Sequence, residues 1–393
     1  MTPAAQAAIK PDFPAPLADT GATDLVAKVR GLGPAFAARI QAADDSDSFV
    51  AANFAELKAA GLVEAGVPAD LGGGGAGVAE LSAMLREMAH HCSSTALAFA
   101  MHTHQVAIPA WRWVRQQAAP VAPLLKRVAA ERLVLLSSGG SDWVAGSGKA
   151  EKVEGGYRIA ARKAFTSASP IGDILMTGAV WEDAPEGPCV LHFGIPMKSP
   201  HVKVLGNWKS MGMRGTGSHD VMIDGHVVPE EGVALKRKQG EWHPLFHIIS
   251  MIAFPIIYAA YLGVAENARD RAVAMAGQRR PSDHVVSLVG RMDTELRAAQ
   301  MAHAAMVRLA ETASPSAATT NETMIARTLV ARHALAAVEL AMEAAGGAAF
   351  YRDNGLERLF RDIQGARYHP MQQGPQATYA GKIALGEDIA TVF

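Results

Sequence analysis

The chain has 393 residues, of which 49% are apolar and 19% are charged, and its formal net charge is −1. This length is enough for two or three structural units with cores of their own, and the composition is ordinary for a globular protein. The near-zero charge provides neither the basic surface that nucleic acid binding requires nor an acidic tail.

The sequence contains no recognisable targeting or membrane-spanning segment. Residues 1–20 are rich in Ala and Pro and lack the basic-then-apolar pattern of a signal peptide. The longest apolar run, Met251 to Ala265, contains Pro255 and is short for a membrane span, so it is interpreted as a buried core helix. Cys92 and Cys189 have no metal or redox spacing. We therefore expect a cytoplasmic protein without disulfides, bound metal or a membrane partner.

Helical periodicity dominates the first third of the chain. Apolar residues recur at spacings of three and four over several stretches, which is typical of amphipathic helices. These stretches are 24–43, 47–60, 78–88 and 93–106, the last beginning at a cap supplied by Ser93 or Ser94. The Gly-rich segment 72–75 interrupts the pattern and predicts a loop. We expect a helical domain over residues 17–130.

Strand-like segments begin after Glu131 and are separated by turn residues. The expected strands are 133–136, 149–153, 157–165, 174–181, 190–196, 202–205 and 219–228. Within 157–165, alternate residues are expected to lie on one covered face of a sheet. They are Tyr157, Ile159, Ala161, Lys163 and Phe165. The pattern predicts a central β-domain over residues 131–239.

The last part of the chain is helical again, which predicts a bundle of helices over residues 240–393. The periodic stretches are 245–275, 282–311 and 321–345. Thr319 with Glu322 matches a capping box for the last of them, and Gly346-Gly347 predicts its end.

Apolar side chains cover more than one stripe of the first helix of this bundle. They are Ile248, Ile249, Ile252, Ile256, Ile257 and Tyr261. A helix with apolar residues on several sides favours association with further copies, so we expect a homo-oligomer built as a dimer of dimers.

Four groups of residues occur in the order and spacing of the motifs of one enzyme superfamily. They are Gly66-Val67-Pro68-Ala69 with the following Gly-rich loop, Gly140-Ser141-Asp142 with Lys163-Ala164-Phe165-Thr166-Ser167, Met211 to Ser218 with Val228-Pro229-Glu230-Glu231, and Leu356 to Asp362. Over nearly its whole length from about Leu25, the chain resembles the acyl-CoA dehydrogenase superfamily. The resemblance implies an α+β fold with an N-terminal helical domain, a central β-barrel or sheet domain and a C-terminal four-helix bundle.

The same motifs imply a flavin site. An isoalloxazine ring needs an apolar face to stack on and hydrogen-bond partners at N5 and at its carbonyl oxygens. By the resemblance, Phe165 supplies the face and Ser167 reaches the N5/O4 edge. Ser138 and the backbone around Gly140 and Ser141 approach the pyrimidine side, where a reduced flavin accumulates negative charge. The resemblance therefore implies a flavoprotein oxidoreductase with FAD as its cofactor.

The residues for the dinucleotide end of FAD depart from the superfamily pattern. Related dehydrogenases hold the pyrophosphate with R-x-x-F-G and, from a neighbouring subunit, with Q-x-x-G-G-x-G. The matching segments place Arg279, Gly346 and Gly347 at this end. The first segment lacks Phe-Gly, and Glu343 replaces Gln in the second. Because a carboxylate repels pyrophosphate, FMN is the alternative cofactor.

The carboxylate base of the dehydrogenases is missing from the matching positions. Counting from Asp362 places Pro370 at its position, and a shifted alignment gives Gln373. The isovaleryl-type position, on the first long helix of the bundle, corresponds to Ala253. None of these side chains can remove an α-proton from a thioester.

His369 stands beside the position of the missing base. By the resemblance it matches a histidine of the two-component flavin monooxygenases, such as dibenzothiophene monooxygenase, which a separate flavin reductase supplies. A histidine can hydrogen-bond oxygen at a flavin or deprotonate a phenol. Those relatives carry another histidine on an N-terminal helix, which corresponds to His102 or His104, and this spacing lets only one of the two point inward. The candidate catalytic residues are His369 and His102.

Three functions remain open on this basis. The missing Glu and the presence of His369 favour a His-assisted flavin monooxygenase that acts on an aromatic or heterocyclic small molecule. The abundance of dehydrogenases in the superfamily favours an acyl-CoA dehydrogenase with an atypical base, which desaturates an acyl-CoA thioester. A non-catalytic flavin- or acyl-binding protein is the third alternative. All three share an expected homotetramer without nucleic acid or membrane partners.

Overall fold

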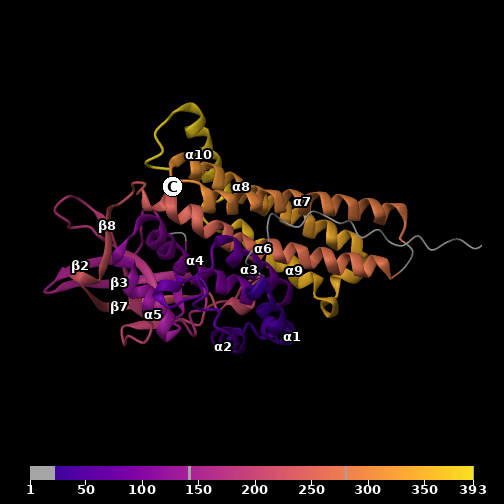
Figure 1. Ribbon diagram of the computed structural model, residues 1–393, viewed down its shortest axis with the longest axis horizontal. Coiled ribbons are helices and arrows are strands. Elements are labelled where there is room, and N and C mark those ends of the chain that lie inside the picture. The colour runs from indigo at the N-terminus through magenta and orange to yellow at the C-terminus, as the bar shows by residue number, and fades with distance from the viewer. Residues whose placement is uncertain (1–22, 140–142, 279–280, 393) are drawn as a thin grey trace, which may run out of the picture.

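The computed structural model of the protein describes residues 23–139, 143–278 and 281–392. Helices occupy the N-terminal third, a mixed β-sheet follows, and a second set of helices completes the described chain. In Figure 1 the sheet lies at one end of the molecule and the long C-terminal helices extend away from it. The fold class expected from the sequence is confirmed.

Five α-helices precede the sheet in the described residues. They are α1 (Thr23–Ser46), α2 (Ala51–Ala59), α3 (Val78–His91), α4 (Ser93–Gln116) and α5 (Ala122–Glu131). The sulfur of Cys92 caps α4 by accepting a hydrogen bond from Thr95 N–H at 3.4 Å. The expected cap at Ser93 or Ser94 was wrong, because both residues lie inside the first turn. Every residue of α4 from Ser93 to His104 is buried, so this helix has no exposed face near the sheet.

Eight strands form one mixed sheet within the described residues. They are β1 (Leu135–Ser137), β2 (Lys149–Val153), β3 (Gly156–Thr166), β4 (Ile174–Trp181), β5 (Cys189–Pro196), β6 (Val202–Val204), β7 (His219–Pro229) and β8 (Val233–Lys238). The strand order is β6-β7-β3-β2-β4-β5-β8, and β1 pairs in parallel with β4. Strand β8 was not expected, because its basic residues resemble a solvated loop, but it pairs antiparallel with β5.

The end of β3 departs from the expected alternation. Ile159, Ala161 and Lys163 are buried, whereas Phe165 is 60% exposed. The pairing of β3 with β7 shifts register between Lys163 and Thr166, and Phe165 has a φ of +54°. A positive φ is uncommon for a residue with a side chain, and together with the bulge it turns the ring away from the covered face. The expected place of Phe165 on that face was therefore wrong.

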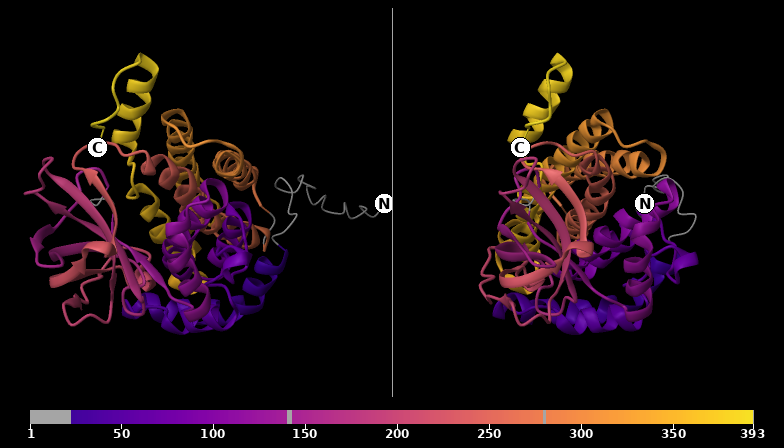
Figure 2. Two further views of the ribbon diagram at one scale, coloured as in Figure 1. Left: turned by 60° about the vertical axis from the view of Figure 1, so that its left-hand side comes forward. Right: turned by 90° about the vertical axis from the view of Figure 1, so that its left-hand side faces the viewer.

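Three long helices and two shorter ones follow the sheet in the described residues. They are α6 (Leu245–Gly277), α7 (Asp283–Thr312), α8 (Ala317–Ala345), α9 (Leu356–Ile363) and α10 (Gln373–Leu385). Ser316 caps α8 by accepting a hydrogen bond from Thr319 N–H at 3.1 Å, so the capping box expected at Thr319 was wrong. Gly346, with a φ of +66°, ends α8 as predicted. Figure 2 shows α10 projecting beyond the long helices, and its buried Tyr379 packs against Trp242 with ring centroids 5.6 Å apart.

Helix α6 forms the centre of the protein. By length and composition it could cross a membrane, with a hydropathy of 2.1 in its most apolar window, but 94% of that window is buried inside the protein. Helices α3, α4, α7 and α8 pack around it. The apolar residues that predicted association, including Ile252, Ile256 and Tyr261, are buried within a single chain. The sequence argument for an oligomer was therefore wrong, because neighbouring helices of the same chain cover these side chains.

Candidate active site

The ends of β1 and β3 meet beside the sheet. Gly139 N–H donates a hydrogen bond to Ala164 O at 2.9 Å. A Cβ added to Gly139 would lie 3.3 Å from the Phe165 ring, so glycine permits the close approach of the two segments. The Phe165 ring contacts Trp208 edge-to-face, with ring centroids 5.9 Å apart. This arrangement presents an exposed aromatic face on a supported backbone.

Hydroxyl groups lie on the segments next to Phe165. Ser167 Oγ lies 2.8 Å from Ser218 Oγ, which in turn lies 2.7 Å from Thr216 Oγ1. Ser138 Oγ lies 3.0 Å from Thr177 Oγ1. The structure therefore brings together Ser138, Phe165 and Ser167, whereas Gly140 and Ser141 lie outside the described residues. Ser218 belongs to the motif Met211 to Ser218 and directly precedes β7, whereas Thr177 lies on β4 and could not be assigned to this site from the sequence.

His102 of α4 is fully engaged with the backbone. Its Nε2 lies 2.9 Å from Val63 O, and its Nδ1 lies 3.0 Å from Leu135 N–H. Because Leu135 N–H donates to Nδ1, the ring proton must reside on Nε2, which donates to Val63 O. Burial lowers the pKa of His102 to about 4. Both nitrogens are thus used to fasten α4 to the start of β1, which leaves none for a substrate.

His104, the next but one residue on α4, has unused hydrogen-bonding capacity. Its Nε2 lies 3.5 Å from Ser137 Oγ, and its buried Nδ1 has no partner. Burial, with a further contribution from His102, lowers its pKa to about 3. Both histidines are buried, because α4 is covered on all sides here, but only His104 has a ring nitrogen without a partner among the described residues. An unpaired buried nitrogen is a feature that ligand sites often explain.

His369 follows a short 3-10 turn, η8 (Gln364–Arg367), at the end of α9. Its Nε2 lies 2.7 Å from the hydroxyl of Tyr261 on α6, and its carbonyl accepts a hydrogen bond from Arg327 Nη2 at 2.7 Å. Burial, Arg327 and His104 together lower the pKa of His369 to about 3. The contribution of His104 indicates that the two imidazoles are close enough for the charge of one to affect the pKa of the other. His369 is therefore a neutral imidazole at physiological pH.

The tautomer of His369 follows from its contact with Tyr261. Within the described residues, His369 Nε2 is the hydrogen-bond partner recorded for the Tyr261 hydroxyl. Burial raises the pKa of Tyr261 well above its ordinary value, so the hydroxyl keeps its proton. When this hydroxyl donates to Nε2, the ring proton of His369 lies on Nδ1, and the imidazole offers an N–H donor on the side that faces away from Tyr261.

Two further residues hold the His369 segment in place. Tyr258 hydroxyl donates to Ala366 O at 2.7 Å, and Arg327 donates to the same oxygen at 3.3 Å. The Arg327 guanidinium also lies over the Tyr258 ring, 5.0 Å from its centroid. Sequence reasoning missed Tyr258, Tyr261 and Arg327. The available signal was the occurrence of polar side chains within helices that are otherwise apolar.

The three positions considered for the missing base lie in different surroundings. Ala253 is buried in α6, Gln373 is exposed at the start of α10, and Pro370 directly follows His369. None of them brings a carboxylate to His369. Within the described residues, the recorded side-chain partners of His369 are Tyr261 and, through its carbonyl, Arg327.

The buried carboxylates of the described chain are all engaged elsewhere. Asp362 accepts hydrogen bonds from Ser93 Oγ and Met213 N–H. Glu266 pairs with Arg86 and Gln300, and Asp44 pairs with Arg361 at 2.6 Å. These acids hold helices together and leave no oxygen free to act as a general base.

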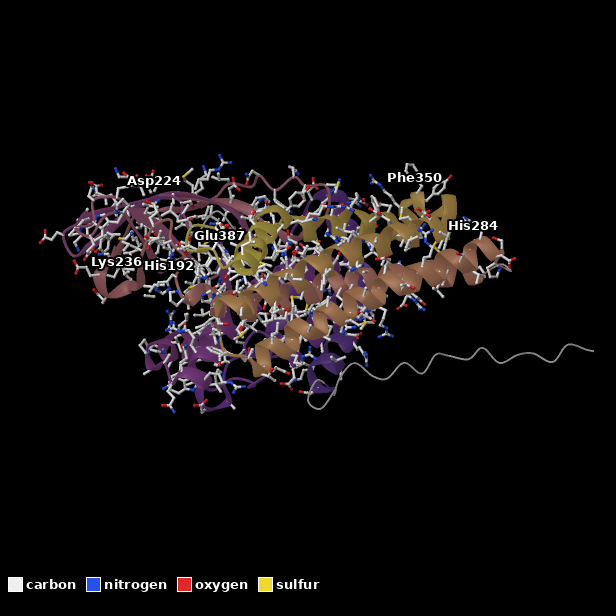
Figure 3. All side chains as sticks on the ribbon, turned by 90° about the horizontal axis from the view of Figure 1, so that it is seen from above. His192, Asp224, Lys236, His284, Phe350 and Glu387 are labelled. Carbon is white, nitrogen blue, oxygen red and sulfur yellow. The ribbon has the colours of Figure 1, made fainter. Side chains whose placement is uncertain are left out.

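Gly346 and Gly347, two candidate residues for the dinucleotide end, lie far from the sheet in a single chain. Gly346 and Gly347 are exposed at the end of α8, and Arg279 lies outside the described residues. Figure 3 shows Phe350 and His284 at the end of the helices, opposite the sheet residue Asp224. One chain therefore does not bring the two groups of candidate cofactor residues together.

Two family models match the chain. The model described as acyl-CoA dehydrogenase, N-terminal domain, matches residues 25–118. The model described as acyl-CoA dehydrogenase, C-terminal domain, matches residues 256–373. Together they cover more than half of the sequence, on both sides of the sheet.

Known proteins share the whole arrangement. Amino sugar nitrososynthase DnmZ of Streptomyces peucetius is 27% identical over 85% of this chain and 86% of its own length. The structure of KijD3 in complex with FMN and dTDP-3-amino-2,3,6-trideoxy-4-keto-3-methyl-D-glucose has a TM-score of 0.86 at 24% identity, covering 94% of this chain and 95% of KijD3. FMN-bound dibenzothiophene monooxygenase TdsC of Paenibacillus sp. A11-2 has a TM-score of 0.80 at 21% identity, covering 94% and 99%. The two structural likenesses establish the fold.

The order of helices and sheet, the two matching family models and the sequence relatives agree with one another. The chain therefore belongs to the acyl-CoA dehydrogenase superfamily of flavoprotein oxidoreductases.

Proposed function

We propose that the chain is a flavin-dependent monooxygenase that uses reduced flavin and oxygen to oxidise a small molecule. The observation that carries this proposal is the neutral His369, held by Tyr261 and without a carboxylate partner in the described part of the chain. Two of the similar proteins, DnmZ and TdsC, have names of oxygenating enzymes, a nitrososynthase and a monooxygenase. Their names support a substrate that is oxidised at nitrogen, at sulfur or on a heterocycle.

The described residues fit the ring end of a flavin. The exposed face of Phe165 suits stacking, and the buried hydroxyl of Ser167 suits a hydrogen bond to the ring edge. Ser138 lies beside Phe165, and we assign Gly140 and Ser141, which follow it, to the pyrimidine side. A bound reduced flavin would supply the electrons for oxygen reduction.

FAD is the proposed cofactor, with FMN as the alternative. The structures of KijD3 and TdsC contain FMN. For FAD, we assign Gly346, Gly347 and Arg279 of a second copy to the dinucleotide end, since one chain separates Gly346 and Gly347 from Phe165. The exposed Glu343 beside Gly346 favours FMN, because its carboxylate would repel a pyrophosphate.

We assign His369 as the catalytic residue that donates a hydrogen bond to the reacting oxygen. A neutral imidazole with its proton on Nδ1 can donate but is a poor base, because its pKa is about 3. Tyr261 positions the ring and keeps the proton on Nδ1. His104, with its unpaired Nδ1, replaces His102 as the second histidine of the proposed site.

The dehydrogenase alternative requires a free base near the substrate. Desaturation of an acyl-CoA removes an α-proton, and the described buried carboxylates are all engaged. A neutral His369 is a weak substitute for the missing Glu. These observations favour oxygenation over desaturation.

Two reactions followed on the same purified protein test the proposal. Reduced flavin supplied by a separate flavin reductase, with oxygen and an amine, thioether or indole, is expected to give an oxygenated product. Octanoyl-CoA under anaerobic conditions is expected to leave bound oxidised flavin unbleached, because no base removes the α-proton. Bleaching by octanoyl-CoA, without oxygenation of any of these compounds, would contradict the proposal and favour the dehydrogenase.

We also propose a cytoplasmic homo-oligomer, in which the far end of the helices meets another copy. Phe350 is 87% exposed and Tyr351 is 70% exposed, directly beyond Gly346 and Gly347. Exposed aromatic residues of this kind are typical of interfaces.

Phe350→Glu is expected to dissociate the oligomer, because it places a charge in an apolar contact. Sedimentation velocity at micromolar concentration measures the change. Phe360→Glu is unsuitable as a control because Phe360 is half-buried, so a charge there would disturb the fold. Val114→Glu is the matched control, since Val114 is 64% exposed but lies on α4. A monomeric wild-type protein, or an unchanged assembly in Phe350→Glu, would contradict the proposed interface.

A further inference from the structure

A cationic cleft lies between the N-terminal and C-terminal helices, away from the candidate active site. It has a volume of about 380 Å³ and is lined by residues of α1, α6 and α9 and of the segment that leads into α9. These three helices lie next to one another in Figure 1. Arg271, Arg352 and Arg358 line the cleft together with Gln41 and Asp45.

Arg358 is a buried guanidinium with most of its donors unused. It is 7% exposed, its Nη1 donates to Gln41 Oε1 at 2.6 Å, and its buried Nε has no partner. Arg361, one turn further along α9, is by contrast paired with both Asp44 and Glu357. The buried Asp362, one turn further along α9, feels the charge of Arg358 without contacting it, so the unpaired Nε donor of Arg358 remains available to another acceptor.

The guanidinium of Arg271 adds a second positive charge to the cleft. Arg271 bonds to neutral groups, Asn267 Oδ1 at 2.9 Å and Asn354 O at 2.6 Å. Within the described residues, neither Arg271 nor Arg358 has a carboxylate within ion-pair distance. Burial, and then the charge of Arg358, lower the pKa of Arg271. The two like charges are therefore close enough to repel each other in a partly buried cleft.

The other polar groups of the cleft are arranged around this pair. Gln41 accepts from Arg358 and donates to Asp45 Oδ1 at 3.0 Å, and Asp45 in turn pairs with the exposed Arg352 at 3.3 Å. Gly355 has a φ of +68°, and a Cβ there would lie 3.1 Å from Arg358 Nη2. The absence of a side chain at Gly355 keeps the guanidinium accessible.

We propose that this cleft binds the phosphate group of a small phosphorylated molecule. Two guanidinium groups supply several N–H donors, and a phosphate oxyanion matches their geometry and charge. A volume of about 380 Å³ exceeds the needs of a bare phosphate. Asp45 and Asp353 at the rim repel further negative charge, although Arg352 pairs with Asp45, so the rest of the ligand is uncharged and carries hydroxyl groups that these carboxylates can accept from, as in a sugar phosphate.

The cleft is distinct from the proposed flavin site. Arg271 lies ten positions after Tyr261 on α6, which places it about 15 Å further along the helix. Binding there therefore does not depend on the proposed monooxygenase reaction.

Calorimetric titration of the purified protein with inorganic phosphate and with ribose 5-phosphate tests this site, with ribose as the uncharged control. We expect one ribose 5-phosphate per chain, tighter binding than for phosphate alone, and no heat with ribose. Arg271→Gln and Arg358→Gln are expected to weaken binding about ten- to hundredfold, as loss of a charge-assisted hydrogen bond does.

A third variant keeps the test independent of the folding role of Arg358. Ala37 lines the cleft from an exposed position on α1, and Ala37→Glu would bring a carboxylate to the arginines and compete with phosphate. Loss of binding in Ala37→Glu with an unchanged melting temperature would support the site. The proposal is overturned if the wild type binds neither probe at millimolar concentration, if all three variants bind as the wild type does, or if Arg271→Gln changes only the sedimentation coefficient.

Discussion

His369→Ala is expected to lower oxygenation turnover by about a hundredfold or more while flavin affinity stays unchanged. The imidazole offers Nδ1–H from a fixed position, because Tyr261 holds Nε2 at 2.7 Å and Arg327 holds the backbone carbonyl at 2.7 Å. Removal of a fixed donor from a reacting oxygen costs roughly two to three orders of magnitude in turnover. Steady-state oxygenation kinetics and flavin titration measure the two effects separately.

His369→Asn distinguishes donation from proton transfer at this position. An asparagine keeps an N–H donor but cannot exchange a proton, so it is expected to recover a substantial part of the turnover lost in His369→Ala. Tyr261→Phe removes the group that fixes the tautomer, and we expect a decrease of about tenfold, the size of one hydrogen bond. If His369→Ala is silent in both the oxygenation and the acyl-CoA assay, His369 only packs and its catalytic assignment is wrong.

The aromatic face of the proposed site shows what a local pattern can and cannot predict. The motif around Phe165 identified the residue, but alternation along β3 placed its ring on the covered face. The register shift between Lys163 and Thr166 reverses this, and it arises from the pairing with β7, more than fifty residues away. The pairing with β7, and therefore the register shift, cannot be predicted from the sequence of β3 alone.

The histidines of α4 show a similar limit. His102 and His104 have the same chemistry, and helical spacing places them on different sides. Val63 O and Leu135 N–H form hydrogen bonds with both ring nitrogens of His102. The histidine that keeps an unused ring nitrogen is therefore His104. These partners of His102 are backbone groups, so they cannot be predicted from the pattern of side chains in the sequence.

The support of His369 is a long-range contact. Tyr261 and His369 are separated by 108 positions, and Arg327 reaches the same loop from α8. The missing carboxylate base could be predicted from the sequence, because it requires only the counting of residues after a motif. The positioning of His369 could not, because three different helices determine it.

The free energy of unfolding is expected to fall steeply in acid, and the protein is expected to unfold with a midpoint of about pH 5. His102, His104 and His303 are buried, and burial lowers their pKa values to about 4, 3 and 4. In the unfolded chain each would take up a proton below an ordinary value of 6.5. The stabilisation is therefore fully present above pH 6.5 and is lost as the pH falls towards 4. Together with His369, whose pKa burial lowers to about 3, these groups give a slope of about 5 kcal/mol per pH unit in the free energy of unfolding.

His303→Gln isolates one of these four contributions. His303 Nε2 lies 2.8 Å from Pro255 O, and a glutamine can donate the same hydrogen bond without taking up a proton. We expect the slope of the free energy of unfolding against pH to fall by about a quarter, since one proton of four is removed when His369 is counted. His284→Gln is the control, because His284 is exposed in the first turn of α7 and its substitution should leave the slope unchanged. Denaturant unfolding monitored by circular dichroism at several pH values between 4.5 and 7.5 measures the slope, and equal slopes in the wild type and His303→Gln would refute this account of acid lability.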